Sequence, residues 1–144
     1  MAVAKNYGRL GLSLMSGEVN FGTHTFKLML CTNLYTPDQG AHRYKSDITN
    51  EVSATGYTAG GTTLTGVALS YDAATNRAWY DANDPSWPTA TITARWAVMY
   101  DSTPSTDATR PLIGYIDFGA DTSSTTATFA VPFDPSGVGY IQAA

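Results

Sequence analysis

The stretch from Thr89 to Tyr100 constrains the fold of this chain more than any other. Apolar and aromatic side chains alternate here with threonine, arginine and alanine, and one face would carry Ile92, Ala94, Trp96, Val98 and Tyr100. Alternation with a period of two over this length predicts a β-strand with one buried face. We interpret the stretch as a central strand, which begins after Trp87 and Pro88 and ends at the turn residues 101–104.

Similar alternation recurs along the chain between segments rich in glycine, proline, asparagine and aspartate. Further strands are expected over residues 25–32, 62–71 with a bulge at Gly66, 77–81, 112–118, 125–133 and 138–141. Only 14% of the residues are charged and threonine is frequent, which favours β-structure. We therefore predict an all-β fold, a single β-sandwich or jelly-roll-like domain of about seven strands over residues 1–144.

The N-terminal segment has a different spacing. Val3, Tyr7, Leu10 and Leu14 recur at steps of three and four residues, which is typical of a helix, and Gly17 is a plausible stop. We expect a short helix or a docking arm over residues 4–16.

Residue patterns typical of enzymes and metal sites are scarce. His24 and His42 have no second histidine or cysteine at the short spacing of a zinc site, which favours structural roles. Asp81 and Asp84 fit an Asx turn before Pro85 better than a calcium loop, since the glycine and the closing glutamate of an EF-hand are missing. The nucleophile-elbow and P-loop motifs are absent too. We expect no catalytic residue, no metal site and no cofactor.

The middle of the chain contains a long polar connection from Tyr35 to Asp47, in which Tyr35, His42 and Tyr44 are interspersed. Asp47 is expected to cap a short helical turn reaching Val52, and Glu51 to take part in the same capping. The glycine-rich segment 56–61 has no lysine after it and leads into a strand, so we interpret it as a turn.

The charge balance excludes some partners. The formal net charge is −4 and the lysines and arginines are scattered, so we expect no nucleic-acid partner. No run approaches the roughly 18 apolar residues that a membrane span needs. Residues 1–5 lack the apolar core of a signal peptide, so we expect a soluble protein made in a cytoplasm. Cys31, the single cysteine, is expected to be a small buried hydrophobe.

The expected strands after Lys45 contain no lysine and few other charges. Exposed edges of monomeric sheets are often protected by such charges. We therefore expect that another subunit covers some edges or faces, as in a homo-oligomer. Loops or bulges that cover the edges are the alternative.

Several motifs together resemble a known family. They are the runs over residues 35–39, 47–52, 56–61, 90–100 and 111–119. In combination they resemble a family of small proteins of tailed bacteriophages, commonly encoded among virion structural genes and often near the capsid gene. The resemblance extends from about Tyr7 to Ile141. It implies a virion component that is made in the host bacterial cytoplasm, and not an enzyme.

Our leading hypothesis is a capsid decoration or cement protein whose partners are the major capsid protein or other virion proteins. The expected contact segments are residues 1–16, 35–45 and 101–110. The candidate partner-contact residues are Tyr7, Leu10, Leu14, Tyr35, His42, Tyr44, Trp79 and Trp87.

Two alternatives stay open at this point. The first is a tail, neck or fibre component of the virion. The second is a carbohydrate-binding module for host-surface glycans, with Trp79, Tyr80 and Trp87 on its binding face. For Trp96 a place in the core is favoured, because sandwich cores commonly contain tryptophan.

Overall fold

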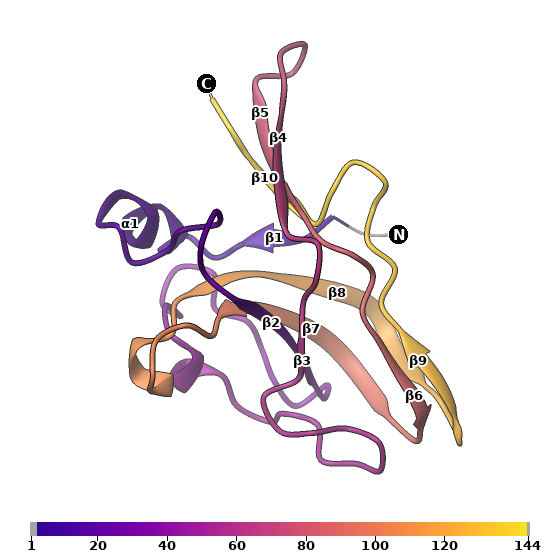
Figure 1. The fold of residues 1–144 in the computed structure, drawn as a ribbon. Coiled ribbons are helices and arrows are strands. Elements are labelled where there is room, and N and C mark those ends of the chain that lie inside the picture. Colours follow the sequence, from indigo (N-terminus) through magenta and orange to yellow (C-terminus); the bar gives the residue numbers. More distant parts are fainter. Residues whose placement is uncertain (1–2, 144) are drawn as a thin grey trace.

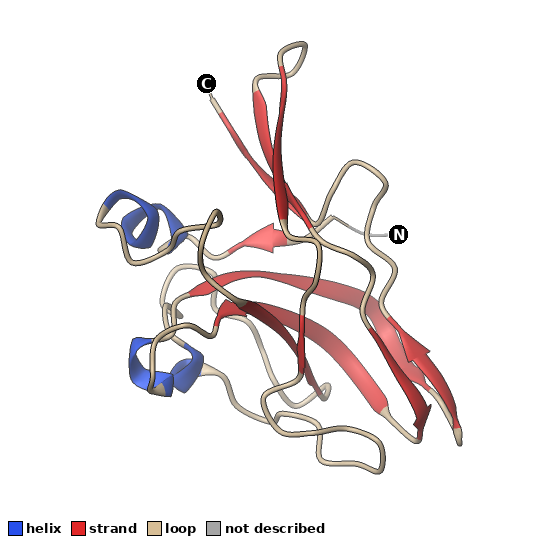
Figure 2. Cartoon of the chain, in the orientation of Figure 1, coloured by secondary structure: helices blue, strands red, loops and turns tan. Residues whose placement is uncertain are grey.

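The computed structural model describes residues 3–143, whose regular secondary structure consists mainly of antiparallel strands joined by long loops (Figures 1 and 2). The strands are β1 (Lys5–Asn6), β2 (Phe26–Cys31), β3 (Thr62–Thr63), β4 (Ala68–Asp72), β5 (Arg77–Asp81), β6 (Ser86–Ala90), β7 (Thr93–Asp101), β8 (Leu112–Ser123), β9 (Ala127–Ala130) and β10 (Gly139–Gln142). The helices are α1 (Leu10–Met15) and the short 3₁₀ turns η1 (Lys45–Asp47) and η2 (Asp107–Thr109). The predicted all-β, sandwich-like fold is confirmed.

The strands form three sheets. A five-stranded sheet has the order β1-β8-β7-β2-β3, a three-stranded sheet the order β10-β5-β4, and β6 pairs with β9. The five-stranded sheet lies in the lower half of Figure 1, and the three-stranded sheet projects upward from it. The hairpin of β4 and β5 is therefore carried away from the main body of the molecule.

The centre of the five-stranded sheet is buried on both faces. Leu28 and Met99 are cross-strand neighbours in the larger core cluster, whereas Met29 and Val98 are neighbours in a second cluster on the opposite face. Loops cover the second face, and Tyr35 from the long connection after β2 belongs to its cluster. A strand buried on both faces reads as a nearly continuous apolar run, and β2 does so apart from Lys27.

The central strand was predicted to place five side chains on one face, and this is wrong. The register between β7 and β8 shifts between Ala94 and Trp96. As a result Ala94 belongs to the larger cluster, while Val98 and Tyr100 belong to the second one. A β-bulge adds one residue to a strand, and every later side chain then points to the opposite face.

Two strand boundaries also differ from the prediction. Residues 86–88 were expected to precede a central strand that begins at Thr89, but residues 86–90 form β6 and the central strand β7 begins only at Thr93. Pro88 fits there because the β6–β9 register is irregular between Trp87 and Ala90, where no ladder hydrogen bond from residue 88 is required. Strand β8 was expected to turn at Gly119, yet it continues to Ser123 with Gly119 at φ +81°.

The N-terminal segment combines a strand and a helix. Residues 5–6 pair with Tyr115 and Gly114 of β8, so this part of the expected arm completes the chain's own sheet. The helix is shorter than the predicted 4–16, and Gly17 follows it at φ +81°, the conformation expected at a helix stop.

The glycine-rich turn over residues 56–61 packs closely against β2. Gly61 has φ +82°, and a Cβ atom built on it would lie 1.9 Å from the carbonyl oxygen of Leu28. Glu51 fastens the turn, since its Oε2 accepts hydrogen bonds from the Tyr57 hydroxyl (2.6 Å) and the Gly60 amide (2.7 Å). The prediction that Glu51 takes part in helix capping is therefore wrong.

Asp47 also differs from its prediction. Its Oδ2 accepts hydrogen bonds from the amides of Arg43 (2.8 Å) and Tyr44 (3.0 Å), which precede it. Asp47 is therefore the last residue of the turn η1 and caps the backbone amides at the start of that turn. Residues 48–52, which follow it, are not helical.

Candidate functional site

The three-stranded sheet, which we call the lobe, consists of β4, β5 and β10, residues 68–81 and 139–142. Its tip is the turn between β4 and β5. The Asp72 carboxylate accepts hydrogen bonds there from the Ala74 amide (3.0 Å) and the Thr75 hydroxyl (2.7 Å), and the latter bond lowers the pKa of Asp72. Asn76 adopts φ +56°, which asparagine tolerates better than most residues. The turn lies where the strands expected over residues 62–71 and 77–81 leave room for it.

Tyr80 anchors the lobe at its base. Its side chain is buried, and its hydroxyl donates a hydrogen bond of 2.6 Å to Oδ1 of Asn6 in β1. The ring of Phe21 stacks on Tyr80 with centroids 5.1 Å apart, and Phe21 also stacks on Phe26 in β2. Burial raises the pKa of Tyr80, so the hydroxyl stays protonated and keeps donating.

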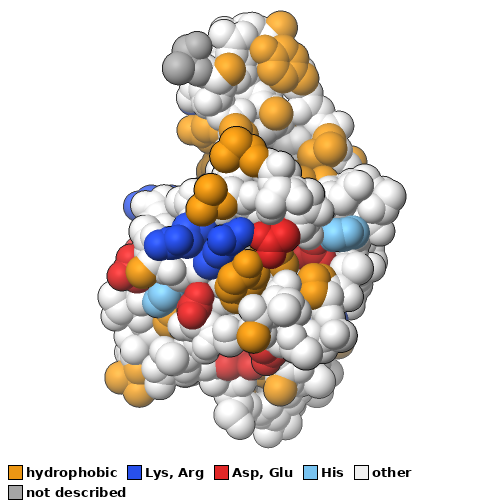
Figure 3. All heavy atoms as spheres, turned by 90° about the vertical axis from the view of Figure 1, so that its left-hand side faces the viewer, with side chains coloured by type: hydrophobic (Ala, Val, Ile, Leu, Met, Phe, Trp, Pro, Cys, Tyr) orange, Lys and Arg blue, Asp and Glu red, His pale blue; other side chains and the backbone are white. Residues whose placement is uncertain are grey.

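One side of the lobe carries exposed apolar side chains. We call it the lobe face, and it consists of Leu69, Tyr71, Ala78 and Ile141. The exposed fractions are 61% for Leu69, 63% for Tyr71 and 43% for Ile141. Figure 3 shows hydrophobic side chains gathered on this projecting part of the molecule. Cross-strand register explains the grouping, because Tyr71 pairs with Ala78 and Ala78 with Ile141.

Strand β4 is also an edge strand, since its single neighbour in the described sheet is β5. All five of its residues are exposed, and Asp72 at its end is the one charged residue among them. A second open edge lies on β8, where β1 pairs at Gly114 and Tyr115 and leaves residues 116–123 unpaired on that side. Such edges offer main-chain hydrogen-bonding groups to another strand.

The structure brings together three predicted contact residues, two of them in the interior. The hydroxyl groups of Tyr7 and Tyr35 lie 2.8 Å apart, and the Tyr35 hydroxyl lies 2.9 Å from Nδ1 of His42. Tyr7 and Tyr35 are buried, and burial raises the pKa of both. This chain of hydrogen bonds fastens the long connection to the N-terminal segment.

The remaining residues of the predicted contact segments have similar structural roles. Tyr44 donates a hydrogen bond of 2.8 Å to Glu18, whose carboxylate also pairs with Arg43. Leu10 is buried in the larger cluster and Leu14 packs against it. Leu14, His42 and Tyr44 keep partly exposed surface, and their contact with a partner stays a prediction.

The tryptophans correct the predicted aromatic face. Trp79, Tyr80 and Trp87 are 8%, 2% and 5% exposed, so they do not form an open surface for a sugar, and Trp79 and Trp87 offer little to a protein partner. Trp96, expected in the core, is only half-buried at the bulge, although its Nε1 is covered and unbonded among the described residues. Trp87 packs against Phe129 in the larger core cluster, whereas Trp79 packs against Tyr140 in the lobe.

The polar groups that suggested a weak calcium loop are used locally. The Asp81 carboxylate accepts from the Ala82 amide at 2.8 Å, and the Asp84 carboxylate from the Phe133 amide at 2.9 Å. Over residues 3–143, no cluster of three or more histidine, cysteine, aspartate and glutamate side chains has the arrangement of a metal site. No helix in this range has the length and apolarity to cross a membrane.

The lobe face was missed by sequence reasoning. Alternation over residues 67–71 was read as a strand, and a strand with Leu69 and Tyr71 on one side would normally bury that side. The available signal was Ala78, the partner of Tyr71 in the hairpin, which is too small to cover it.

Comparison with family models, with curated protein sequences and with solved structures found no match to this chain.

Proposed function

We propose that this protein is a bacteriophage virion structural protein that decorates the assembled capsid and binds neighbouring coat subunits through the lobe. The observation that carries the proposal is the lobe face, where Leu69, Tyr71 and Ile141 are 61%, 63% and 43% exposed beside an open strand edge. Exposed apolar side chains grouped on one surface are typical of interaction sites.

The lobe supplies two kinds of binding energy. Covering Leu69, Tyr71 and Ile141 removes apolar surface from water, which favours association. Pairing of a coat-protein strand with β4 would satisfy main-chain groups that face solvent in the single chain. Binding only to the assembled shell stabilises that shell by mass action, and many symmetric copies multiply weak contacts.

The resemblance to tailed-phage structural proteins supports a place in the virion, and the copy number per particle tests which place. We expect purified particles to contain hundreds of copies, near-stoichiometric with the coat protein, as measured by quantitative mass spectrometry. About three, six or twelve copies would favour the tail, neck or fibre alternative. Absence from the particle would overturn both.

A second experiment tests the lobe itself. In the double variant Leu69→Ser/Tyr71→Ser, occupancy of assembled shells is expected to fall at least about tenfold, because the exposed anchors are lost. Leu34→Ser is the matched control, since Leu34 is 73% exposed in the loop after β2 and lies outside the lobe. Equal occupancy of shells by wild type and the double variant would contradict the proposed interface.

A further inference from the structure

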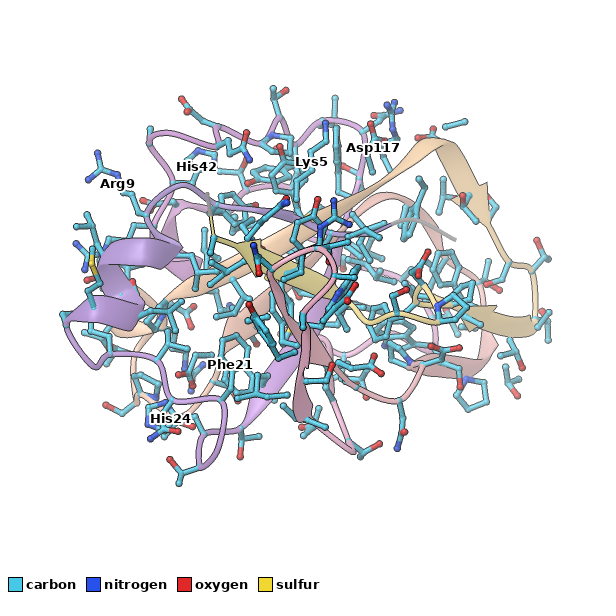
Figure 4. All side chains as sticks on the ribbon, turned by 90° about the horizontal axis from the view of Figure 1, so that it is seen from above. Lys5, Arg9, Phe21, His24, His42 and Asp117 are labelled. Atoms are coloured by element: carbon cyan, nitrogen blue, oxygen red, sulfur yellow. The ribbon has the colours of Figure 1, made fainter. Side chains whose placement is uncertain are left out.

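A cavity of about 500 Å³ lies on the side of the lobe opposite the lobe face. The N-terminal segment and the connection after β2 close its base, and β5 and β10 form its wall. Its functional lining residues are Lys5, Asn6, Gln39, Arg77, Trp79 and Tyr140. Figure 4, seen from above, shows Lys5 and Phe21 on different sides of the hairpin, so the cavity is separate from the stacked aromatic base.

The cavity is positively charged. None of its eight lining residues is acidic, and among residues 3–143 neither Lys5 nor Arg77 forms an ion pair. The cross-strand neighbour of Arg77 is Asp72, whose carboxylate is engaged in the turn at the tip. The charge of Lys5 also acts on Asp117, whose carboxylate is engaged by Arg95. Two cations in a shared hollow, with these carboxylates engaged elsewhere, favour an anionic ligand.

Arg77 is held in place by an aromatic ring. Its Cζ atom lies 4.2 Å from the ring centroid of Tyr140, and its Nε is covered and unbonded among the described residues. The ring of Tyr140 in turn lies 4.8 Å from that of Trp79, centroid to centroid. A stacked guanidinium loses less freedom when it binds a carboxylate in the bidentate geometry that arginine favours.

The polar side chains at the base of the cavity are also held by hydrogen bonds. Nε2 of Gln39 donates a hydrogen bond of 2.7 Å to the main-chain oxygen of Asn6, and Nδ2 of Asn6 donates one of 2.7 Å to the oxygen of Tyr140. Within the described residues, Oε1 of Gln39 accepts no hydrogen bond and stays open to a hydroxyl donor.

We propose that this cavity binds an acidic sugar of the uronic-acid class, with its carboxylate on Arg77 and Lys5 and a ring hydroxyl on Gln39. A volume of about 500 Å³ lies in the range of small-molecule sites and exceeds what a lone carboxylate group fills. The partly exposed ring of Tyr140 provides the apolar part of the wall, and the buried ring of Trp79 lies against it. The proposal is independent of the virion role.

The three tryptophans give a direct test by NMR, because each contributes one indole N–H signal and only Trp79 lines the cavity. Glucuronate titrated into the ¹⁵N-labelled protein is expected to shift the Trp79 signal saturably, with a Kd in the millimolar range. Trp79→Phe assigns the signal. Glucose and acetate serve as probes for the ring alone and the carboxylate alone, and both are expected to bind at least about tenfold more weakly.

Variants locate the ligand. Arg77→Gln is expected to raise the Kd for glucuronate at least about tenfold, whereas Lys27→Gln, the same loss of charge on β2 outside the cavity, leaves it unchanged. Unshifted Trp87 and Trp96 signals in both variants confirm that the fold is kept. No saturable shift of Trp79 at about 50 mM glucuronate, or equal binding of acetate, overturns the proposal.

Oligosaccharides of different length distinguish a polysaccharide from a free sugar as the source of the ligand. A tetramer of galacturonate that binds at least about tenfold more tightly than the monomer indicates a polysaccharide. Equal affinities indicate a free sugar, and either result supports the site.

Discussion

Strands β2 and β4 carry a similar alternation of apolar residues, and their surroundings differ completely. Leu28 and Leu30 in β2 are fully buried, whereas Leu69 in β4 is 61% exposed. Strand β2 lies between β7 and β3 and is covered on both faces, while β4 forms the edge of the projecting lobe. The comparison teaches that alternation determines which side chains share a face, and that the other segments determine whether this face is covered.

The largest expected difference is between truncations of one aromatic side chain in β2 and one in β4. Phe26→Ala in β2 should lower the free energy of unfolding by about 3–5 kcal/mol, because the fully buried ring leaves a cavity. Tyr71→Ala on the lobe face should stay within about 0.5 kcal/mol. Urea unfolding of dilute protein measures both. A cost for Tyr71→Ala close to that for Phe26→Ala would show that the lobe face is covered even in the free protein.

A smaller but still severe effect is expected where the glycine-rich turn meets β2. Gly61→Ala combines a positive φ with a Cβ atom 1.9 Å from the Leu28 oxygen, and should cost about 3 kcal/mol. Gly11→Ala is the matched control, because a Cβ at this helical position meets nothing within 4 Å and alanine is the better helix former. It should raise the melting temperature, and a loss of stability in Gly11→Ala would refute this explanation.

The hydrogen bond that anchors the lobe to β1 is tested by the variant Tyr80→Phe. Removing the hydroxyl leaves Oδ1 of Asn6 without its 2.6 Å hydrogen bond, at an expected cost of about 1–2 kcal/mol. Hydrogen exchange should speed up in the lobe and leave β2 and β7 unchanged. In Tyr71→Phe, which loses an exposed hydroxyl bonded to Asn76, exchange should match the wild type.

The smallest effect concerns pH dependence at the exposed end of β8. Hydrogen bonding from the Arg95 guanidinium, 2.8 Å from Nε to Oδ1, lowers the pKa of Asp117 below its usual range. A lowered pKa gives stability that is fully present above the ordinary aspartate pKa and is lost as the pH falls through the lowered value. Asp117→Asn should therefore flatten the acid end of the stability profile slightly. Asp134→Asn, far from Arg95 in the sequence, serves as the charge control, and identical profiles for wild type and Asp117→Asn would contradict the effect.

The fold class could be predicted because β-branched and aromatic residues alternate between recognisable turns, and the hairpin over residues 68–81 is an example. The face assignment of the central strand could not. Its error comes from the register shift between Ala94 and Trp96, since a bulge leaves no clear mark in the residue pattern.

The candidate site was harder to predict than the fold. The contact residues chosen from the sequence were mostly aromatic, and several of them, such as Tyr7, Tyr35 and Trp87, are buried in the core. Leu69 and Tyr71 looked like ordinary buried strand residues. Their exposure depends on the absence of any described segment over the lobe face, and such long-range coverage is a property of the tertiary structure.

The position of β10 in the lobe has a consequence for how the chain is made. This strand is the last described one to leave the ribosome, and it pairs with β5, while the Ala4 amide bonds to the Val138 oxygen at 2.7 Å. Synthesis proceeds from the N-terminus at about 5–20 residues per second. The sheet that carries the lobe face is therefore completed only after all the other described strands have emerged. A chain that ends before β10 would lack Ile141 and the strand that pairs with β5, so its lobe face would be incomplete.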